Sequence, residues 1–235
     1  IIALTAPSVW AADIPESKRS LDAVKRNSAP LKTELAAKSL SLGSPVFLRI
    51  TKTQSLIDPR GKLEAFIENG AGEYVLFKDW DICYYSGGLG PKYKEGDGKT
   101  PEGFYTVPPD MMNPNSDYHL SFDLGFPNAY DRALGRTGSY LMVHGDCVSI
   151  GCYAMTDDSI EEIYTIVDAA MRAGQADVPV HAFPFPMTDE NLDARSGNVN
   201  IEFWKNLKEG WDAFEETKRP PKVSAADKKY VFTVN

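Results

Sequence analysis

Short runs of hydrophobic residues, separated by turn sequences, dominate the middle of the chain. The first three runs are rich in Val, Ile, Phe and Tyr, and Asp-Pro-Arg-Gly and Asn-Gly-Ala-Gly separate them. Such turns join antiparallel neighbours, so these runs predict a meander of strands. The predicted strands span residues 46–51, 62–68, 74–85, 103–107, 118–125, 139–145 and 178–183, with a closing strand at 230–234.

Helical periodicity is strongest in the segment that Asp157 is predicted to cap. Apolar side chains recur there at intervals of three, four, seven and eleven residues, and Gly174 follows as a stop signal. A second amphipathic helix is predicted over residues 201–217. Residues 14–43 predict two short surface helices, interrupted by Pro30. The fold class is therefore mainly β or α+β, with flanking helices.

Length and composition predict one main domain with an extension at each end. The chain has 235 residues, of which 43% are hydrophobic, enough to bury a sizeable core. We predict an N-terminal helical extension at 13–43, a main domain at 44–185, and a C-terminal helical extension with a closing strand at 186–235. Residues 86–117 carry six glycines and five prolines, which predicts long loops of the kind that often hold functional sites.

Net charge and the first residues bear on partners and compartment. Lys+Arg 25 against Asp+Glu 33 gives −8, so no global basic field would attract nucleic acid. Residues 1–12 are apolar or small, and Val9 and Ala11 have the spacing of a signal-peptidase site. We interpret residues 1–12 as a signal-peptide remnant, which predicts export; an ordinary apolar N-terminus is the competing interpretation. No later window approaches the roughly 18 apolar residues of a membrane span, so no transmembrane segment is expected in the mature chain.

The most informative chemical signal is a histidine and a cysteine that stand eight residues apart. An apolar strand ends at His144, and we expect a hairpin to return Cys152 beside it. A free thiol has a pKa of about 8.5, whereas the attacking species is the thiolate. An adjacent imidazolium would stabilise the thiolate and later protonate a leaving amine. The backbone N–H groups around Gly151 and Cys152 are the candidate oxyanion donors.

Two other roles fit the same residue types. Cys152 could be a buried small hydrophobe, which is the commonest state of a free cysteine. Alternatively, His144, Cys147 and Cys152 could begin a zinc site, although no compact ligand pair repeats elsewhere. The fourth ligand would then be Asp146, His119 or Cys83.

The cysteine count is odd, so at least one thiol lacks an internal partner. In an oxidising compartment Cys83 and Cys147 could form a disulfide and leave Cys152 as the reactive thiol. Two reduced core cysteines are an equally good interpretation, because sequence alone does not show that the two Cα atoms lie within reach.

Two motifs resemble a known family. The segment GDGKTPEGFYTV at 96–107, followed by HG and SIGC within 144–152, is similar to the L,D-transpeptidase or YkuD-type catalytic domain of bacterial cell-wall enzymes. The nine residues SIGCYAMTD at 149–157 resemble its proteobacterial branch more closely. That branch includes the amidase that detaches Braun's lipoprotein from peptidoglycan. The resemblance covers about residues 45–185.

The resemblance implies a β-sandwich catalytic domain that needs no cofactor and no metal. The predicted cleaved signal peptide places this domain in the periplasm. In this family a cysteine attacks the amide after the L-centre of meso-diaminopimelate in a peptidoglycan stem peptide, forming a thioester acyl-enzyme. Matched to this sequence, Cys152 is the nucleophile, His144 is the residue that activates it, and Gly151 is the glycine before the nucleophile.

The sequence also departs from the general family pattern. The family usually has a second histidine where Ile150 stands and an Arg or Asn near Tyr153, and its spacing from histidine to cysteine is longer. These departures leave the acyl acceptor open. An amine would give a cross-link, whereas water would make the enzyme an L,D-amidase or carboxypeptidase that acts on stem peptides or lipoprotein-linked peptidoglycan.

Several other residues are candidates for substrate binding. Tyr118 and His119 follow the glycine-rich loops on a predicted strand, and Ser149 and Tyr153 flank the cysteine. A local basic cluster is suited to the carboxylates of stem peptides, and a solvated loop surface is its alternative. The cluster comprises Lys92, Lys94, Lys99, Arg132 and Arg136. The second function class is a non-catalytic cell-wall-binding protein, against which the intact histidine–cysteine pair argues.

Overall fold

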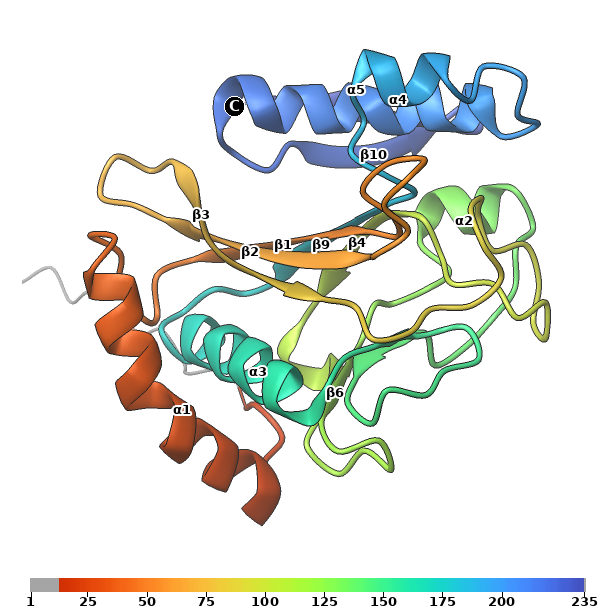
Figure 1. Ribbon diagram of the computed structural model, residues 1–235. Coiled ribbons are helices and arrows are strands. Elements are labelled where there is room, and N and C mark those ends of the chain that lie inside the picture. The colour runs from red at the N-terminus through yellow and green to blue at the C-terminus, as the bar shows by residue number, and fades with distance from the viewer. Residues whose placement is uncertain (1–12, 235) are drawn as a thin grey trace, which may run out of the picture.

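The protein is built around a five-stranded sheet that is covered by helices on both sides (Figure 1). The computed structural model describes residues 13–234. Neighbouring strands in this sheet are antiparallel, except β1 and β9, which are parallel. In order, the strands are β3 (Tyr74–Asp81), β2 (Lys62–Glu68), β1 (Val46–Thr51), β9 (Val178–Phe183) and β4 (Gly103–Val107).

The predicted histidine ends a strand of a second, four-stranded sheet, and the predicted cysteine directly precedes another strand of that sheet. Its strands, in order, are β5 (Met112–Asn113), β6 (Ser121–Asp123), β7 (Met142–His144) and β8 (Tyr153–Ala154). The expected hairpin between His144 and Cys152 is wrong, because β7 and β8 are parallel, with His144 paired to Ala154. Residues 145–152 therefore form a loop that returns the chain to the start of a parallel neighbour.

The two longest predicted helices are present. Helix α3 (Asp157–Arg172) packs beneath the larger sheet, and α5 (Ile201–Thr217) lies above it (Figure 1). The N-cap of α3 is Thr156 rather than Asp157, because the Thr156 hydroxyl accepts the Ser159 N–H. The pattern did not reveal α2 (Ala129–Ala133), α4 (Asp189–Asp193) or a 3-10 turn at Pro109–Met111.

Residues 14–43 form one main helix rather than two. Helix α1 (Lys18–Ala36) runs through Pro30, which removes one backbone hydrogen bond. A capping box at Ser17 starts the helix, and its buried face includes Leu31 and Leu35, which join the core that contains α3. Burial of this face offsets the loss at the proline.

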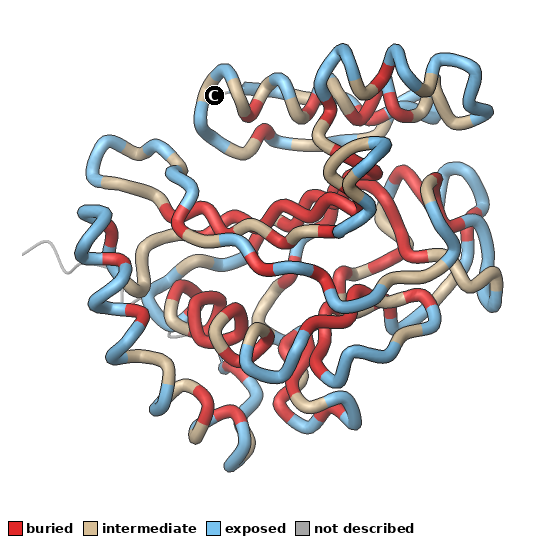
Figure 2. The backbone as a smooth tube through the Cα atoms, viewed as in Figure 1, coloured by how far each residue is buried: buried red, intermediate tan, exposed pale blue. Residues whose placement is uncertain are grey.

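The larger sheet is buried on both faces, as the red trace through its central strands shows (Figure 2). On one face, Leu48 and Ile50 of β1 join the core with α3 and the second sheet. On the other, Phe47 packs against Phe214 of α5. The segment after residue 185 is thus a structural cover for the sheet.

The closing strand at 230–234 does not join either sheet. It is β11 (Lys229–Thr233), and it pairs with β10 (Lys222–Ala226) in a separate hairpin. The strand predicted at 118–125 is also shorter, because His119 adopts a left-handed backbone with φ of 66° and pairing begins at Ser121. The mixed sheets and helices nevertheless confirm the predicted α+β class.

Within residues 13–234, no helix combines the length and apolar character needed to cross a bilayer. The predicted signal-peptide remnant at 1–12 lies outside the described residues.

Candidate active site

His144 and Cys152 line the same pocket, which has a volume of about 330 Å³. His144 ends β7, and Cys152 immediately precedes the parallel neighbour β8, so the two residues lie at adjacent strand ends. The other lining residues are Tyr118, Val148, Ser149 and Ile150. The pocket combines a candidate base and a candidate nucleophile in one concave surface.

The His144 ring is fixed by two neighbours. Its Nδ1 lies 2.6 Å from the Gly145 carbonyl oxygen, to which it donates, so Nε2 is the acceptor nitrogen. The Tyr118 ring lies against the imidazole at a centroid distance of 4.7 Å. Burial lowers the pKa of His144, although the Gly145 carbonyl and the charge of Asp146 oppose this shift. The substrate-free ring is therefore a neutral base.

The Cys152 sulfur is held by backbone groups. Its S–H donates to the Tyr140 carbonyl at 3.4 Å, and it accepts the Met142 N–H at 3.4 Å. Burial raises the pKa of the thiol, which the Met142 N–H partly opposes. These pKa directions disfavour the expected imidazolium–thiolate pair in the substrate-free protein. They favour proton transfer from a neutral thiol to a neutral imidazole during attack.

We expect the rate of Cys152 alkylation by iodoacetamide to rise with pH and to level off only above the ordinary pKa of a free thiol. A raised thiol pKa keeps the thiolate fraction at pH 7 below that of free cysteine, so each pH unit adds about tenfold to the rate until the pKa is reached. Mass spectrometry of the labelled peptide measures this rate, with Cys152→Ala as the blank. A rate that is already at its plateau below pH 7 would show an ion pair instead.

The two predicted oxyanion donors are both occupied. The Gly151 N–H donates to Ser86 Oγ at 2.7 Å, and the Cys152 N–H donates to Ser149 Oγ at 2.8 Å. Gly151 has a φ of 106°, a left-handed conformation that favours glycine. In the substrate-free protein two serine hydroxyls therefore accept these N–H groups, and the assignment of the two groups to the oxyanion stays a prediction.

Cys83 and Cys147 form a disulfide, with their Cα atoms 5.2 Å apart. The bond ties the segment after β3 to the loop that leads to Cys152, which is left as a free thiol. Because both sulfurs are in the disulfide, Cys83 and Cys147 are not available as ligands for the alternative zinc site. Across residues 13–234, no three His, Cys, Asp or Glu side chains gather closely enough to hold a metal ion.

We expect the double variant Cys83→Ala/Cys147→Ala to lower the free energy of unfolding by about 2–4 kcal/mol. The disulfide restricts the unfolded chain, and its loss removes that restriction. Urea unfolding under oxidising conditions measures the difference. Dithiothreitol should lower the stability of the wild type but not of the variant. If wild type and variant are equally stable both with and without dithiothreitol, the prediction is wrong.

The predicted basic cluster does not form a free anion site. Lys92 pairs with Asp97 at 2.7 Å, and Arg136 pairs with Asp131 at 2.8 Å; both cations are buried. The Lys99 ammonium donates to the Gly87 carbonyl at 3.0 Å and braces the loop. Arg132 is exposed and donates to the Pro127 carbonyl. Substrate carboxylates would have to compete with these internal partners.

Two further candidates lie away from the pocket. His119 bonds through Nε2 to Glu161 at 2.9 Å, and Arg26 of α1 contacts the same carboxylate. Tyr153 is completely buried, and its hydroxyl donates to the Pro101 carbonyl at 2.7 Å. Its assignment to substrate binding is therefore wrong. Tyr118 and Ser149 do line the pocket.

A buried ion pair that was not predicted from the sequence stabilises the loop beside this site. Lys52 and Glu102 are both fully buried, with Nζ and Oε1 3.0 Å apart. Glu102 also accepts the Gly90 N–H at 2.7 Å and the Trp204 Nε1–H at 3.0 Å. The pair thus anchors the glycine-rich loop that presents Ser86 to Gly151. The one sequence feature that pointed to this pair was Glu102, within the segment GDGKTPEGFYTV.

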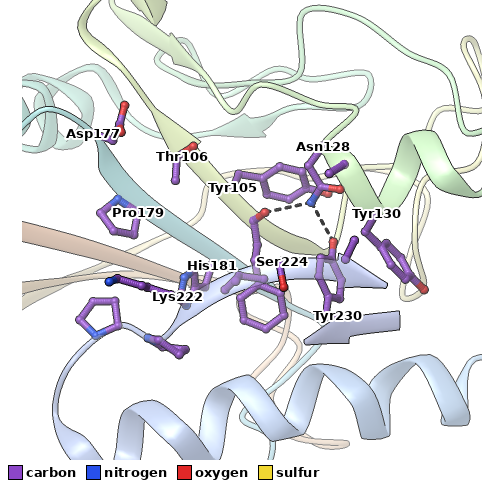
Figure 3. A pocket seen from close by; sticks show the side chains of 16 residues that line it. Tyr105, Thr106, Asn128, Tyr130, Asp177, Pro179, His181, Lys222, Ser224 and Tyr230 are labelled. Carbon is purple, nitrogen blue, oxygen red and sulfur yellow. Dashed lines mark hydrogen bonds between the residues drawn. The ribbon is translucent and has the colours of Figure 1, made fainter. Parts of the chain in front are cut away.

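A separate cavity of about 430 Å³ lies between β4, β9, α2 and β10 (Figure 3). Asn128 bridges its wall by donating to the Phe104 carbonyl at 2.9 Å and to Tyr230 Oη at 2.8 Å. Burial lowers the pKa of His181 in this cavity to about 3, so its ring is neutral. Among residues 13–234, none lines both this cavity and the pocket of His144.

Comparison with known proteins identifies the family. The family model for the L,D-transpeptidase catalytic domain, YkuD, matches residues 58–181. The protein named "Putative L,D-transpeptidase YafK" from Escherichia coli (strain K12) is 46% identical over 192 residues, which cover 82% of this chain and 75% of that protein.

Solved structures are more distant in sequence. The helical cell shape determining protein Pgp2 (K307A mutant) from Campylobacter jejuni is 20% identical, with a TM-score of 0.44, over 86% of this chain and 68% of that one. Bdellovibrio bacteriovorus Bd1075 is 15% identical, with a TM-score of 0.41, over 80% of this chain and 84% of that one. On the family model and the YafK identity, the chain belongs to the L,D-transpeptidase catalytic-domain family, YkuD.

Proposed function

We propose that this protein is a cysteine acyltransferase that acts on peptidoglycan stem peptides at the L-centre of meso-diaminopimelate. Membership of the L,D-transpeptidase family supports an enzyme of this class. The observation that carries the proposal is the single pocket shared by a neutral His144 base and the Cys152 thiol. A non-catalytic wall-binding protein would not need a free thiol and an acceptor nitrogen in one pocket.

In the first half of the proposed reaction, His144 Nε2 takes the thiol proton while the Cys152 sulfur attacks the carbonyl carbon. The imidazolium then returns this proton to the leaving amine as the C–N bond breaks, leaving a thioester. The hydrogen bond from Nδ1 to Gly145 holds the ring with Nε2 as the acceptor for this transfer.

In the second half, the same imidazole deprotonates the acceptor, which attacks the thioester carbonyl. The C–S bond breaks and the sulfur recovers the proton. An amine acceptor forms a new amide cross-link, whereas water releases a free carboxylate. The YafK identity supports transfer, and the SIGCYAMTD segment supports the hydrolytic alternative, an L,D-amidase or carboxypeptidase.

We also propose that the protein works in the periplasm. The disulfide between Cys83 and Cys147 supports an oxidising compartment, because such bonds are rare in reducing cytosol.

The test is incubation of the purified protein with disaccharide-tetrapeptides and, separately, with lipoprotein-linked muropeptides in ¹⁸O-water. Joined stems detected by mass spectrometry show transfer. Trimmed stems or released lipoprotein remnants that carry ¹⁸O show hydrolysis. If neither substrate changes relative to a Cys152→Ala control, the proposed function is wrong.

A further inference from the structure

Asp123 places a carboxylate on the same face of the second sheet as the candidate base. Strand β6 pairs antiparallel with β7, and the register sets Asp123 opposite Met142. Side chains alternate along a strand, so Asp123, Met142 and His144 share one face. The opposite face carries Phe122 and Val143, which are fully buried in the main core. Asp123 therefore lies on the face of the sheet that carries His144 rather than on the core face.

The strand register also brings Asp123 close to the sulfur. Its cross-strand neighbour Met142 donates its backbone N–H to Cys152 Sγ at 3.4 Å. Burial is the main cause of the raised pKa of the Cys152 thiol, and the negative charge of Asp123 adds to it. The carboxylate and the sulfur thus interact electrostatically, as expected for groups around one site.

This carboxylate has no cation within reach. One oxygen accepts the Gly125 N–H at 2.8 Å, and among residues 13–234 the other oxygen has no hydrogen-bond partner. No Lys, Arg or His among them lies within 4.0 Å of it. Burial raises the pKa of Asp123, with only the Gly125 N–H opposing it. The unbonded oxygen is not sealed from solvent, so an incoming ligand can reach it and replace water as its partner.

The two buried cations of the predicted basic cluster are already paired. Lys92, whose charge acts on the Cys152 thiol in the opposite sense to Asp123, pairs with Asp97. Arg136 pairs with Asp131. The unpaired charge beside the sulfur is therefore negative. An incoming group that neutralises it must be cationic.

We infer that Asp123 binds a protonated amine on the acyl donor, and so selects donors whose attacked residue carries a free side-chain ammonium. The inference rests on the proposed function and deepens it. When the L-centre carbonyl of diaminopimelate is attacked, the amine at the other end of that side chain remains free. Pairing this ammonium with Asp123 orients the carbonyl toward Cys152, because a charge-assisted hydrogen bond fixes the far end of the donor.

The first test needs no turnover. Cys152 is labelled with the cationic reagent 2-(trimethylammonium)ethyl methanethiosulfonate and the anionic 2-sulfonatoethyl methanethiosulfonate, and the ratio of the two rates is measured. In Asp123→Asn this ratio is expected to fall about tenfold relative to wild type. Asp146→Asn is the matched control, because it removes an exposed carboxylate beside His144 from the loop rather than from β6, and should change the ratio less. Equal ratios in wild type and Asp123→Asn would overturn the inference.

The second test measures kcat/KM for donors with a free or an N-acetylated side-chain amine. The wild type should favour the free amine by about 10- to 100-fold, and Asp123→Asn should lose most of this preference. Equal use of both donors by the wild type, or an unchanged preference in the variant, would overturn the inference. If no donor is consumed at all, the proposed function fails, while the labelling ratio still decides whether Asp123 selects cations.

Discussion

Replacing Cys152 by alanine is expected to reduce both transfer and hydrolysis at least about a thousandfold. Both outcomes pass through the same thioester, and alanine has no atom that can form it. Mass analysis of muropeptide products measures the loss, and intact-protein mass detects the acyl-enzyme that the variant should lack. Thermal unfolding should show that the variant remains folded.

His144→Gln separates the base from the nucleophile. Turnover should fall about 10²- to 10⁴-fold, because glutamine does not take up the thiol proton at neutral pH. Alkylation of Cys152 at pH 9 should stay close to wild type, since the resting thiolate is not held by an imidazolium. A variant that loses alkylation at pH 9 but retains turnover would contradict both roles.

Lys52→Met is expected to lower the free energy of unfolding by about 3–5 kcal/mol. The change leaves the Glu102 carboxylate fully buried without its cation. The Gly88, Gly90 and Thr100 carbonyls would also lose the Lys52 ammonium as a donor. Urea unfolding monitored by tryptophan fluorescence measures the loss.

Two further variants give this prediction its controls. Lys52→Met combined with Glu102→Leu removes both charges and should recover part of the lost stability. Lys205→Met breaks an exposed pair with Glu202 and should change stability by no more than about 0.5 kcal/mol. If Lys52→Met unfolds at the same urea concentration as Lys205→Met, the buried pair is not a stabilising anchor.

Local pattern was enough to predict most of the strands and the helices α3 and α5. Residues 46–51, 62–68 and 103–107 are strands as predicted, because each is a short apolar run between turns. The predictions were wrong where contacts between segments distant in sequence determine the local structure. The pairing of His144 with Ala154 depends on a loop that returns to a parallel neighbour, and packing of α1 keeps the helix continuous through Pro30.

The site was predictable in its residue types but not in its hydrogen bonds. The motif placed His144 and Cys152 together, yet nothing local showed that Ser86 would occupy the Gly151 N–H. The partners of Lys92 and Arg136 were five positions away in sequence and could have been suspected. The partner of Lys52 is fifty positions away, so only the fold reveals it.

The disulfide between Cys83 and Cys147 closes a covalent ring of the polypeptide. The ring encloses the glycine-rich loop, β4 to β7 and His144, whereas Cys152 lies just outside it. A protease that nicks any exposed loop inside the ring would leave the two pieces attached until a reductant separates them. In an environment rich in secreted proteases, a cut through the long loops would therefore not by itself release the fragment that carries β1 to β3 from the fragment that carries His144 and Cys152.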